Sequence, residues 1–193
     1  DTTAVILDQL AARLPEKISV LHLKKNSGKA EAVRQGFLAG FGMAPAFIGY
    51  LDADLAAPFA CIQELESLLV NKHKDVAIGA RVALLGHHVK RNFARHCAGR
   101  LFATVASLLL GLPVYDTQCG AKLFRVTDRL KNIFASPFTV QWIFDVEILA
   151  RFIITEQDAL PRLKDICVEH PLHEWSDKKG SKLRLKDFIA SAL

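Results

Sequence analysis

Two carboxylates lie where a metal site could be built. Asp52 and Asp54 are separated by Ala53 and directly follow residues 46–51, an apolar run typical of a buried strand. Carboxylates at this spacing can share one hard divalent cation, and Mg²⁺ or Mn²⁺ prefers oxygen ligands that include substrate phosphates. The alternative is a turn whose aspartate caps the helix that starts near Pro58. The strand end favours the metal site, so we predict Asp52 and Asp54 as its ligands.

A second candidate site is Asn26-Ser27-Gly28-Lys29, between a β-like run at residues 18–23 and a helical pattern. A glycine here lets backbone N–H groups approach a phosphate, and the positive end of the helix favours the negative charge. The segment is not a Walker A loop, because Leu23 and Ala30 replace residues that this motif requires. An ordinary turn with a helix N-cap is the alternative to a phosphate site.

Asp145 is a candidate catalytic residue because it shares a helical face with Leu149 and Phe152. An unpaired carboxylate on an apolar face is costly to bury, so its presence needs a reason. Glu147, in contrast, lies four residues before Arg151, which is the spacing of a routine ion pair on a helix surface. We therefore predict a functional role for Asp145 and a structural one for Glu147.

The basic residues around position 90 indicate an anionic ligand. Arg91 and Arg95 are four residues apart, so a helix places them on one face, and the apolar stretch 101–112 follows. A basic turn before an apolar helix suits a membrane interface, and arginine binds phosphate bidentately. We predict that Arg91 and Arg95, with Arg81 at a nearby strand end, hold a lipid phosphate. The alternative is that the apolar face packs on the sheet and the arginines are solvated. The side chains expected to face the lipid are Leu101, Phe102, Val105 and Leu109.

Cysteines and histidines indicate no further site. The cysteines form no CxxC pair and no disulfide framework, so buried free thiols are expected: Cys61, Cys97, Cys119 and Cys167. The seven histidines show no metal-ligand spacing, and the adjacent His87 and His88 are predicted to lie in a surface loop.

The remaining pattern positions these residues on an α/β domain. Helical and β-like segments alternate through the first eighty residues, which is typical of a mostly parallel sheet covered by helices. Ligands bind such sheets at the carboxyl ends of strands, where Asp52 and Asp54 are expected. The second half predicts a helix at 91–110, a strand at 118–126, a helix at 142–154, a strand at 165–170, a loop at 176–184 and a helix at 185–193.

Length and charge agree with one domain that binds an anion. The 193 residues suit a single domain, and half of them are apolar. The formal charge of +5 fits a nucleotide or an anionic lipid. Nucleic acid is disfavoured because the basic residues lack interleaved aromatics. The chain shows no signal peptide, and its longest nearly apolar run, 101–114, is shorter than the roughly 20 residues that span a bilayer.

The ordered motifs resemble the inverting glycosyltransferases of family 2, in the branch that acts on polyprenyl phosphates. The similarity is strongest to the dolichyl-phosphate glucosyltransferase type. It rests on segments along nearly the whole chain: Asn26-Ser27-Gly28-Lys29, Asp52-Ala53-Asp54-Leu55, Gly79-Ala80-Arg81, Asp116-Thr117-Gln118-Cys119-Gly120, Phe144-Asp145-Val146-Glu147 and Gly180-Ser181-Lys182-Leu183.

The resemblance implies a GT-A-like fold, with one catalytic domain over residues 1–193 from which the family's first strand is absent. It implies inverting transfer of a hexose from a nucleotide-diphosphate sugar to polyprenyl phosphate, with UDP-glucose favoured and GDP-mannose second. Mg²⁺ or Mn²⁺ would be the cofactor, at the cytoplasmic face of a membrane. Ala56 replaces the glutamine of mannosyltransferase relatives. The alternatives are transfer to a glycan or glycolipid hydroxyl, with Asp145 as base, and a non-catalytic binding relative.

The resemblance also assigns residues to roles. The donor would be bound by Asn26, Gly28, Lys29, Arg34, Asp52, Ala53, Asp54 and Gln118. Catalysis would depend on Asp52, Asp54 and Asp145. The acceptor phosphate would be held by Arg81, Arg91, Arg95 and Lys182.

Overall fold

The computed structural model describes residues 2–90, 93–156 and 161–176. The helices are α1 (Thr3–Arg13), α2 (Gly28–Phe41), α3 (Ala60–Asn71), α4 (Phe93–Leu110), α5 (Asp128–Ala135), α6 (Phe144–Ile154) and α7 (Leu163–Ile166). The strands are β1 (Phe47–Leu51), β2 (Val76–Ala80), β3 (His88–Lys90), β4 (Ala121–Arg125), β5 (Cys167–Pro171) and β6 (Glu174–Ser176). The predicted α/β class is confirmed.

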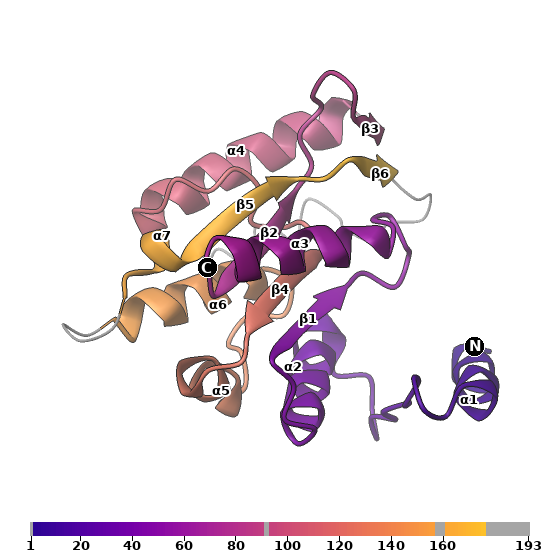
Figure 1. Cartoon of the computed structure of the whole chain (residues 1–193). Helices are drawn as coiled ribbons and strands as arrows, with labels where there is room; N and C mark the ends of the chain where they lie inside the picture. Colours follow the sequence, from indigo (N-terminus) through magenta and orange to yellow (C-terminus); the bar gives the residue numbers. More distant parts are fainter. Residues whose placement is uncertain (1, 91–92, 157–160, 177–193) are drawn as a thin grey trace.

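The main sheet is mixed, in the order β1-β4-β2-β5 (Figure 1). Strand β4 pairs antiparallel with both β1 and β2, whereas β2 and β5 are parallel. Three of the four strands therefore run in one direction, as expected, but a reversed strand lies between β1 and β2. Strands β3 and β6 form a separate parallel pair, which the sequence did not predict. The reversal matters for the site, because it places the start of β4 beside the ends of two other strands.

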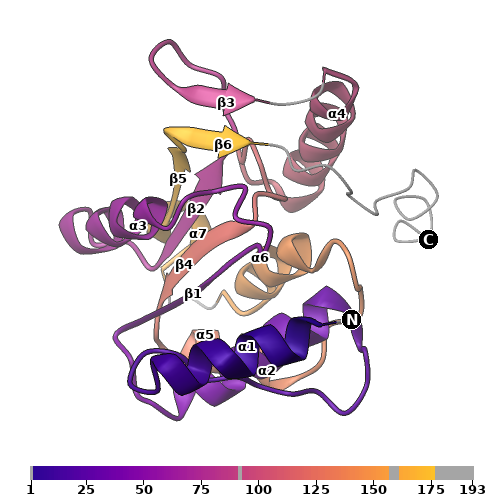
Figure 2. The same ribbon diagram turned by 90° about the vertical axis from the view of Figure 1, so that its right-hand side faces the viewer.

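Helices cover both faces of the sheet, giving three layers (Figures 1 and 2). Alternation along β4 explains this, because successive side chains of a strand point to opposite faces. Phe124 joins the apolar cluster formed with α2, α5 and α6. Leu123 joins the cluster formed with α3. The apolar faces of α2, α3, α5 and α6 thus each have a sheet face to pack against.

The run at residues 18–23 predicts a strand, and the structure has none there. Its alternating apolar residues lack a neighbouring strand among the described residues, and a strand is stable only when its backbone groups are paired. Within the same described ranges, β1 pairs only with β4, so the other edge of β1 is unpaired there.

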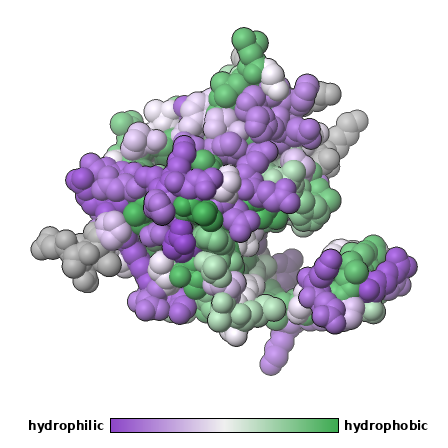
Figure 3. Space-filling model, in the orientation of Figure 1, coloured by the Kyte–Doolittle hydropathy of each residue, from purple (hydrophilic) through white to green (hydrophobic). Residues whose placement is uncertain are grey.

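Helix α1 contributes no buried residue. Its apolar side chains make a strip on the surface, visible in Figure 3: Val5, Ile6, Leu7 and Leu10. The contact between His22 and Asp8, 2.8 Å between Nε2 and Oδ1, ties the following segment back to this helix.

Helix α4 has two different faces. Ala103 and Ala106 are buried, whereas Leu101, Val105 and Leu108 are exposed. The apolar residues of α4 are therefore not all packed on the sheet. Among the described residues, no helix combines the length and apolarity needed to cross a bilayer.

Candidate functional site

The carboxylate of Asp52 is seated against the segment that precedes β4. Because β4 runs antiparallel to β1, its start lies beside the end of β1, and Leu51 pairs with Ala121. The backbone N–H of Asp52 donates to the carbonyl of Gly120 at 2.9 Å. A Cβ atom on Gly120 would lie 2.1 Å from Cγ of Asp52. Only glycine leaves room for this carboxylate. The segment before β4 and the end of β1, 68 positions apart, are therefore packed directly against each other.

The Asp52–Ala56 turn presents the second carboxylate to solvent. The N–H of Leu55 donates to the carbonyl of Asp52 at 3.2 Å, and Leu55 has a left-handed φ of +52°. Oδ1 of Asp54 accepts the N–H of Ala56 at 3.0 Å. The alternative of an aspartate that caps a helix is thus partly present, because Asp54 accepts a backbone N–H. The N–H belongs to Ala56 in the turn and not to α3. An ionised carboxylate has about four acceptor positions, so this contact is compatible with a bound cation.

Lys29 lies directly against Asp52. Its Nζ is 2.6 Å from Oδ1 of Asp52, and it stands 5.6 Å from the centre of the Phe144 ring. The lysine is placed by the start of α2, where Gly28 has a φ of +84° and its N–H donates to Oδ1 of Asn26. A cationic group already beside Asp52 indicates that this strand end favours positive charge. Asp52 and Asp54 therefore fit Mg²⁺ or Mn²⁺, which accept oxygen ligands.

Asp145 is buried in a polar group that the sequence did not reveal. Its Oδ1 accepts hydrogen bonds from the Tyr50 hydroxyl and from Nζ of Lys122, which also donates to the carbonyl of Cys119 at 2.6 Å. Tyr50 and Lys122 are direct partners across β1 and β4, so both side chains point toward α6. Burial, together with the charge of Asp145, raises the pKa of Tyr50 well above its usual value, so the phenol keeps its proton.

Lys122 is the residue that sequence reasoning missed, although a signal existed. It is a charged residue within β4, whose other members are apolar apart from Arg125 at its end. Just as an aspartate on an apolar helix face needs a partner, so does a lysine in a buried strand. Lys122 and Asp145 therefore compensate each other's buried charge.

A second ion pair forms where β2 ends. The guanidinium of Arg81 is bidentate to Asp116, at 2.6 and 2.7 Å, and stacks 5.1 Å from the ring centre of Trp175. Glu169 fixes the loop, because its carboxylate accepts the N–H of Asp116 at 2.6 Å and that of Tyr115 at 2.7 Å. Burial raises the pKa of Glu169.

The loop between Asp116 and Gly120 is closely packed. The side-chain amide nitrogen of Gln118 is buried and has no hydrogen-bond partner in the part of the chain described. Burial raises the pKa of Cys119 to about 12, so its thiol is not a nucleophile at neutral pH.

The remaining basic residues predicted for the site are Arg34, Arg91, Arg95 and Lys182. Arg34 is buried, and its guanidinium bonds to Glu31 and to the carbonyls of Phe134 and Ala135, so it joins α2 to α5. These contacts give Arg34 a structural role, and its binding of the nucleotide sugar stays a prediction. Arg91 and Lys182 lie outside the described residues, as does the side chain of Arg95. The predicted pair of Glu147 with Arg151 is confirmed, at 2.7 Å.

The contact between Gly120 and Asp52 gives a direct prediction. Gly120→Ala should displace the Asp52 carboxylate and lower Mn²⁺-dependent nucleotide affinity at least ~10-fold, since even outer-shell changes at metal sites cost this much. Calorimetry with Mn²⁺ and nucleotide measures the effect. Gly36→Ala is the matched control, because nothing lies within 4 Å of its added Cβ. Equal affinities in the two variants would show that the seating of Asp52 on Gly120 is unimportant.

Comparison with known proteins places this geometry in a family. The model of glycosyl transferase family 2 matches residues 1–129. Dolichyl-phosphate beta-glucosyltransferase of Saccharomyces cerevisiae is 34% identical over 182 residues, covering 88% of this chain and 51% of the relative. The protein of that name from Drosophila melanogaster is 34% identical over 188 residues, with 94% and 54% covered. Polyprenol monophosphomannose synthase of Mycolicibacterium smegmatis is 29% identical over 128 residues, with 65% and 47% covered. The chain spans about half the length of the curated relatives it matches.

Proposed function

The chain belongs to glycosyl transferase family 2, and we propose that it transfers a hexose, with glucose favoured, from a nucleotide-diphosphate sugar to a polyprenyl phosphate. The names of the relatives support both the hexose and the lipid phosphate. UDP-glucose is the favoured donor and GDP-mannose the second. The described elements, built around the four-stranded main sheet, would act as a single catalytic domain.

The observation that carries the proposal is the meeting of three separate motifs at Asp52. Lys29 from the start of α2, the turn containing Asp54, and Gly120 before β4 all contact or adjoin this one carboxylate. Asn26 and Gly28 lie in the same turn as Lys29 and would approach the donor phosphates. Ala53 and Gln118 belong to the other two segments. A nucleotide-diphosphate sugar, with two phosphates to neutralise, fits this arrangement when the two aspartates hold a divalent cation beside the lysine.

Asp52 and Asp54 would hold Mg²⁺ or Mn²⁺, which supplies charge neutralisation for the departing diphosphate. Lys29 would shift from Asp52 to a donor phosphate and add a second positive charge. The acceptor oxygen would attack the anomeric carbon from the side opposite the leaving diphosphate, which inverts that centre.

The environment of Asp145 favours a phosphate acceptor over a hydroxyl. A hydroxyl acceptor needs a general base, and such a base must reach the proton that it removes. Asp145 is only 2% exposed and accepts from both Lys122 and Tyr50. A phosphate oxygen is already ionised at neutral pH and needs no base. Asp145 would then be a positioning residue that fixes Lys122 and Tyr50 beside Asp52.

The acceptor phosphate would be bound by basic side chains. Arg91, Arg95 and Lys182 remain predictions, because their side chains are outside the described part of the structure. The exposed part of the Arg81 side chain would also contact the acceptor phosphate, while Asp116 fixes the orientation of the guanidinium.

The exposed face of α4 supports a location at a membrane surface, for which the cytoplasmic face is our proposal. Leu101, Leu108 and Leu109 are 70%, 77% and 82% exposed. The first two are seven residues apart, which places them on one side of the helix. An amphipathic helix of this kind can lie in the headgroup region with its apolar side chains toward the lipid chains.

This location is testable through α4 itself. Leu108→Ser with Leu109→Ser should weaken binding to anionic phospholipid vesicles about 10-fold or more, because two leucines lose apolar burial in the lipid. Sedimentation with vesicles measures the change. Met43→Ser, at an equally exposed position beyond α2, is the matched control. Unchanged vesicle binding in the α4 variant would exclude this face as the membrane contact.

The proposed activity is tested by incubating the full-length protein with Mg²⁺, polyprenyl phosphate and a panel of radiolabelled nucleotide sugars. Label should pass to the lipid fraction, most strongly from UDP-glucose. Label on an added glycan or glycolipid instead would indicate the hydroxyl-acceptor alternative. Tight binding of a nucleotide sugar without any transfer would indicate a non-catalytic relative.

A further inference from the structure

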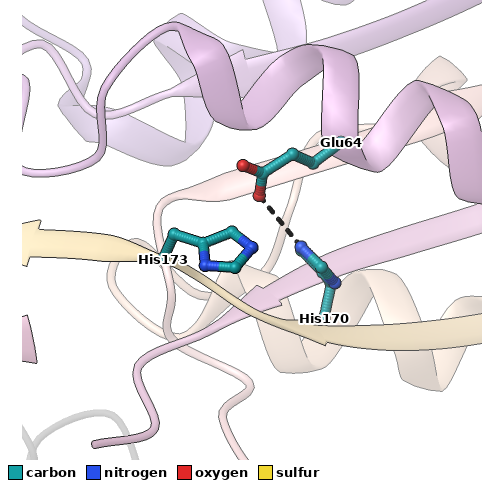
Figure 4. A group of neighbouring side chains, drawn as sticks. All are labelled: Glu64, His170 and His173. Carbon is teal, nitrogen blue, oxygen red and sulfur yellow. Dashed lines mark hydrogen bonds and ion pairs between the residues drawn. The ribbon is translucent and has the colours of Figure 1, made fainter. Parts of the chain in front are cut away.

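Three side chains that commonly bind transition metals meet on the α3 side of the sheet. Glu64 comes from α3, His170 from β5, and His173 from the connection between β5 and β6 (Figure 4). Oε2 of Glu64 lies 2.9 Å from Nε2 of His170, and one ligand atom from each residue lies within 4.8 Å of the others. No local sequence pattern indicates this group, because Glu64 precedes His170 by 106 residues.

The distance between the ligand atoms of Glu64 and His170 is close to that in a zinc site, and a ligand atom of His173 lies within 4.8 Å of both. Bonds of about 2.0–2.1 Å in a tetrahedron place neighbouring ligand atoms about 3.3 Å apart. The distance between Oε2 of Glu64 and Nε2 of His170 would increase by a few tenths of an ångström on binding the metal. His173 is exposed, and its ring stacks on that of His87 with 4.5 Å between the ring centres, so it would approach by rotating out of this stack without disturbing the core.

Two imidazoles and one carboxylate select a different cation from Asp52 and Asp54. Imidazole suits Zn²⁺, whereas all-oxygen sites suit Mg²⁺ and Mn²⁺. There is also room for a fourth ligand. Glu64 and His173 border a pocket of about 130 Å³, also lined by Pro58, Ala60, Cys61 and Glu174. A water molecule or a small anion could complete a tetrahedron there.

We infer that Glu64, His170 and His173 form a Zn²⁺ site that is separate from the donor site and independent of the proposed function. The metal would link α3 to the β5–β6 connection. That connection leads to the buried Trp175, which supports the guanidinium of Arg81. Ser176, one residue further, donates its N–H to the carbonyl of Ala56 at 3.1 Å. Zinc would thus stabilise a segment that contacts both the Asp52–Ala56 turn and Arg81.

The test is Zn²⁺ binding by the full chain in excess Mg²⁺, measured by competition with a chromophoric chelator. One Zn²⁺ per chain is expected. Glu64→Gln and His173→Gln should each lower the affinity at least ~100-fold, since loss of a direct ligand exceeds the outer-shell cost of about 10–100-fold. Co²⁺ in place of Zn²⁺ should give the visible absorption of a tetrahedral site. The same two substitutions should abolish that absorption.

Two control variants establish whether these three residues hold the metal. His73→Gln, in a residue outside the group, should leave the Zn²⁺ affinity unchanged. Asp52→Asn with Asp54→Asn should also retain Zn²⁺ binding, whatever happens to nucleotide binding. Zn²⁺ affinity that survives in both Glu64→Gln and His173→Gln, or that is lost only in the aspartate variant, would overturn the inference. Circular dichroism of each variant checks that the fold is retained.

Discussion

Replacing Asp54 by asparagine should lower Mn²⁺-dependent nucleotide affinity at least ~100-fold while the fold is retained. The side chain is exposed at the end of β1 and makes one described hydrogen bond, to the N–H of Ala56. Asparagine has an oxygen that can keep this bond, so the turn should survive. What the substitution removes is one of the two negative charges on the cation. Calorimetry with and without Mn²⁺ separates the metal-dependent part of the affinity.

A matched control distinguishes loss of a ligand from a general change of charge. Asp128→Asn removes the same charge from an exposed residue of α5, whose described ion partner is Lys131. Its Mn²⁺-dependent affinity should equal that of the unaltered chain. If Asp54→Asn and Asp128→Asn bind nucleotide equally well with Mn²⁺, the metal site is elsewhere.

Local patterns predicted most elements, because their stability depends on their own apolar spacing. The strand predicted at 165–170 lies within two residues of the observed bounds of β5 at each end, and the helix predicted at 142–154 lies within two residues of the observed start of α6. The Asp52 turn was found because a charged pair after an apolar run is conspicuous. In each case the information lies within a dozen consecutive residues.

Pairing between distant segments could not be predicted in the same way. Alternation at 18–23 indicates a strand, but whether a strand forms depends on a neighbour that no local pattern reveals. The reversed direction of β4 is likewise invisible in its sequence. Yet that reversal places Gly120 against Asp52 and puts Lys122 opposite Tyr50. The contacts of Arg34 are a further example, since its partners at Phe134 and Ala135 are about 100 residues away.

The Lys122–Asp145 pair gives the largest expected effect on stability. Both side chains are almost fully buried, at 1% and 3% exposure. Removing one partner leaves an uncompensated buried charge, which typically costs about 3–5 kcal/mol. Asp145→Asn and Lys122→Met should therefore each lower the free energy of unfolding by about that amount, as measured by denaturant titration.

Replacing the whole group by apolar residues separates stability from catalysis. Tyr50→Phe, Lys122→Met and Asp145→Leu together leave no buried charge or hydroxyl, so most of the lost stability should return, as it does for other buried ion pairs. Turnover should nevertheless fall at least ~100-fold, the cost of a small misplacement of reacting groups. Nucleotide affinity should persist, because Asp52, Asp54 and Lys29 are unchanged. Turnover at the original rate in this stable triple variant would show that Asp145 only maintains packing, and its positioning role would then be rejected.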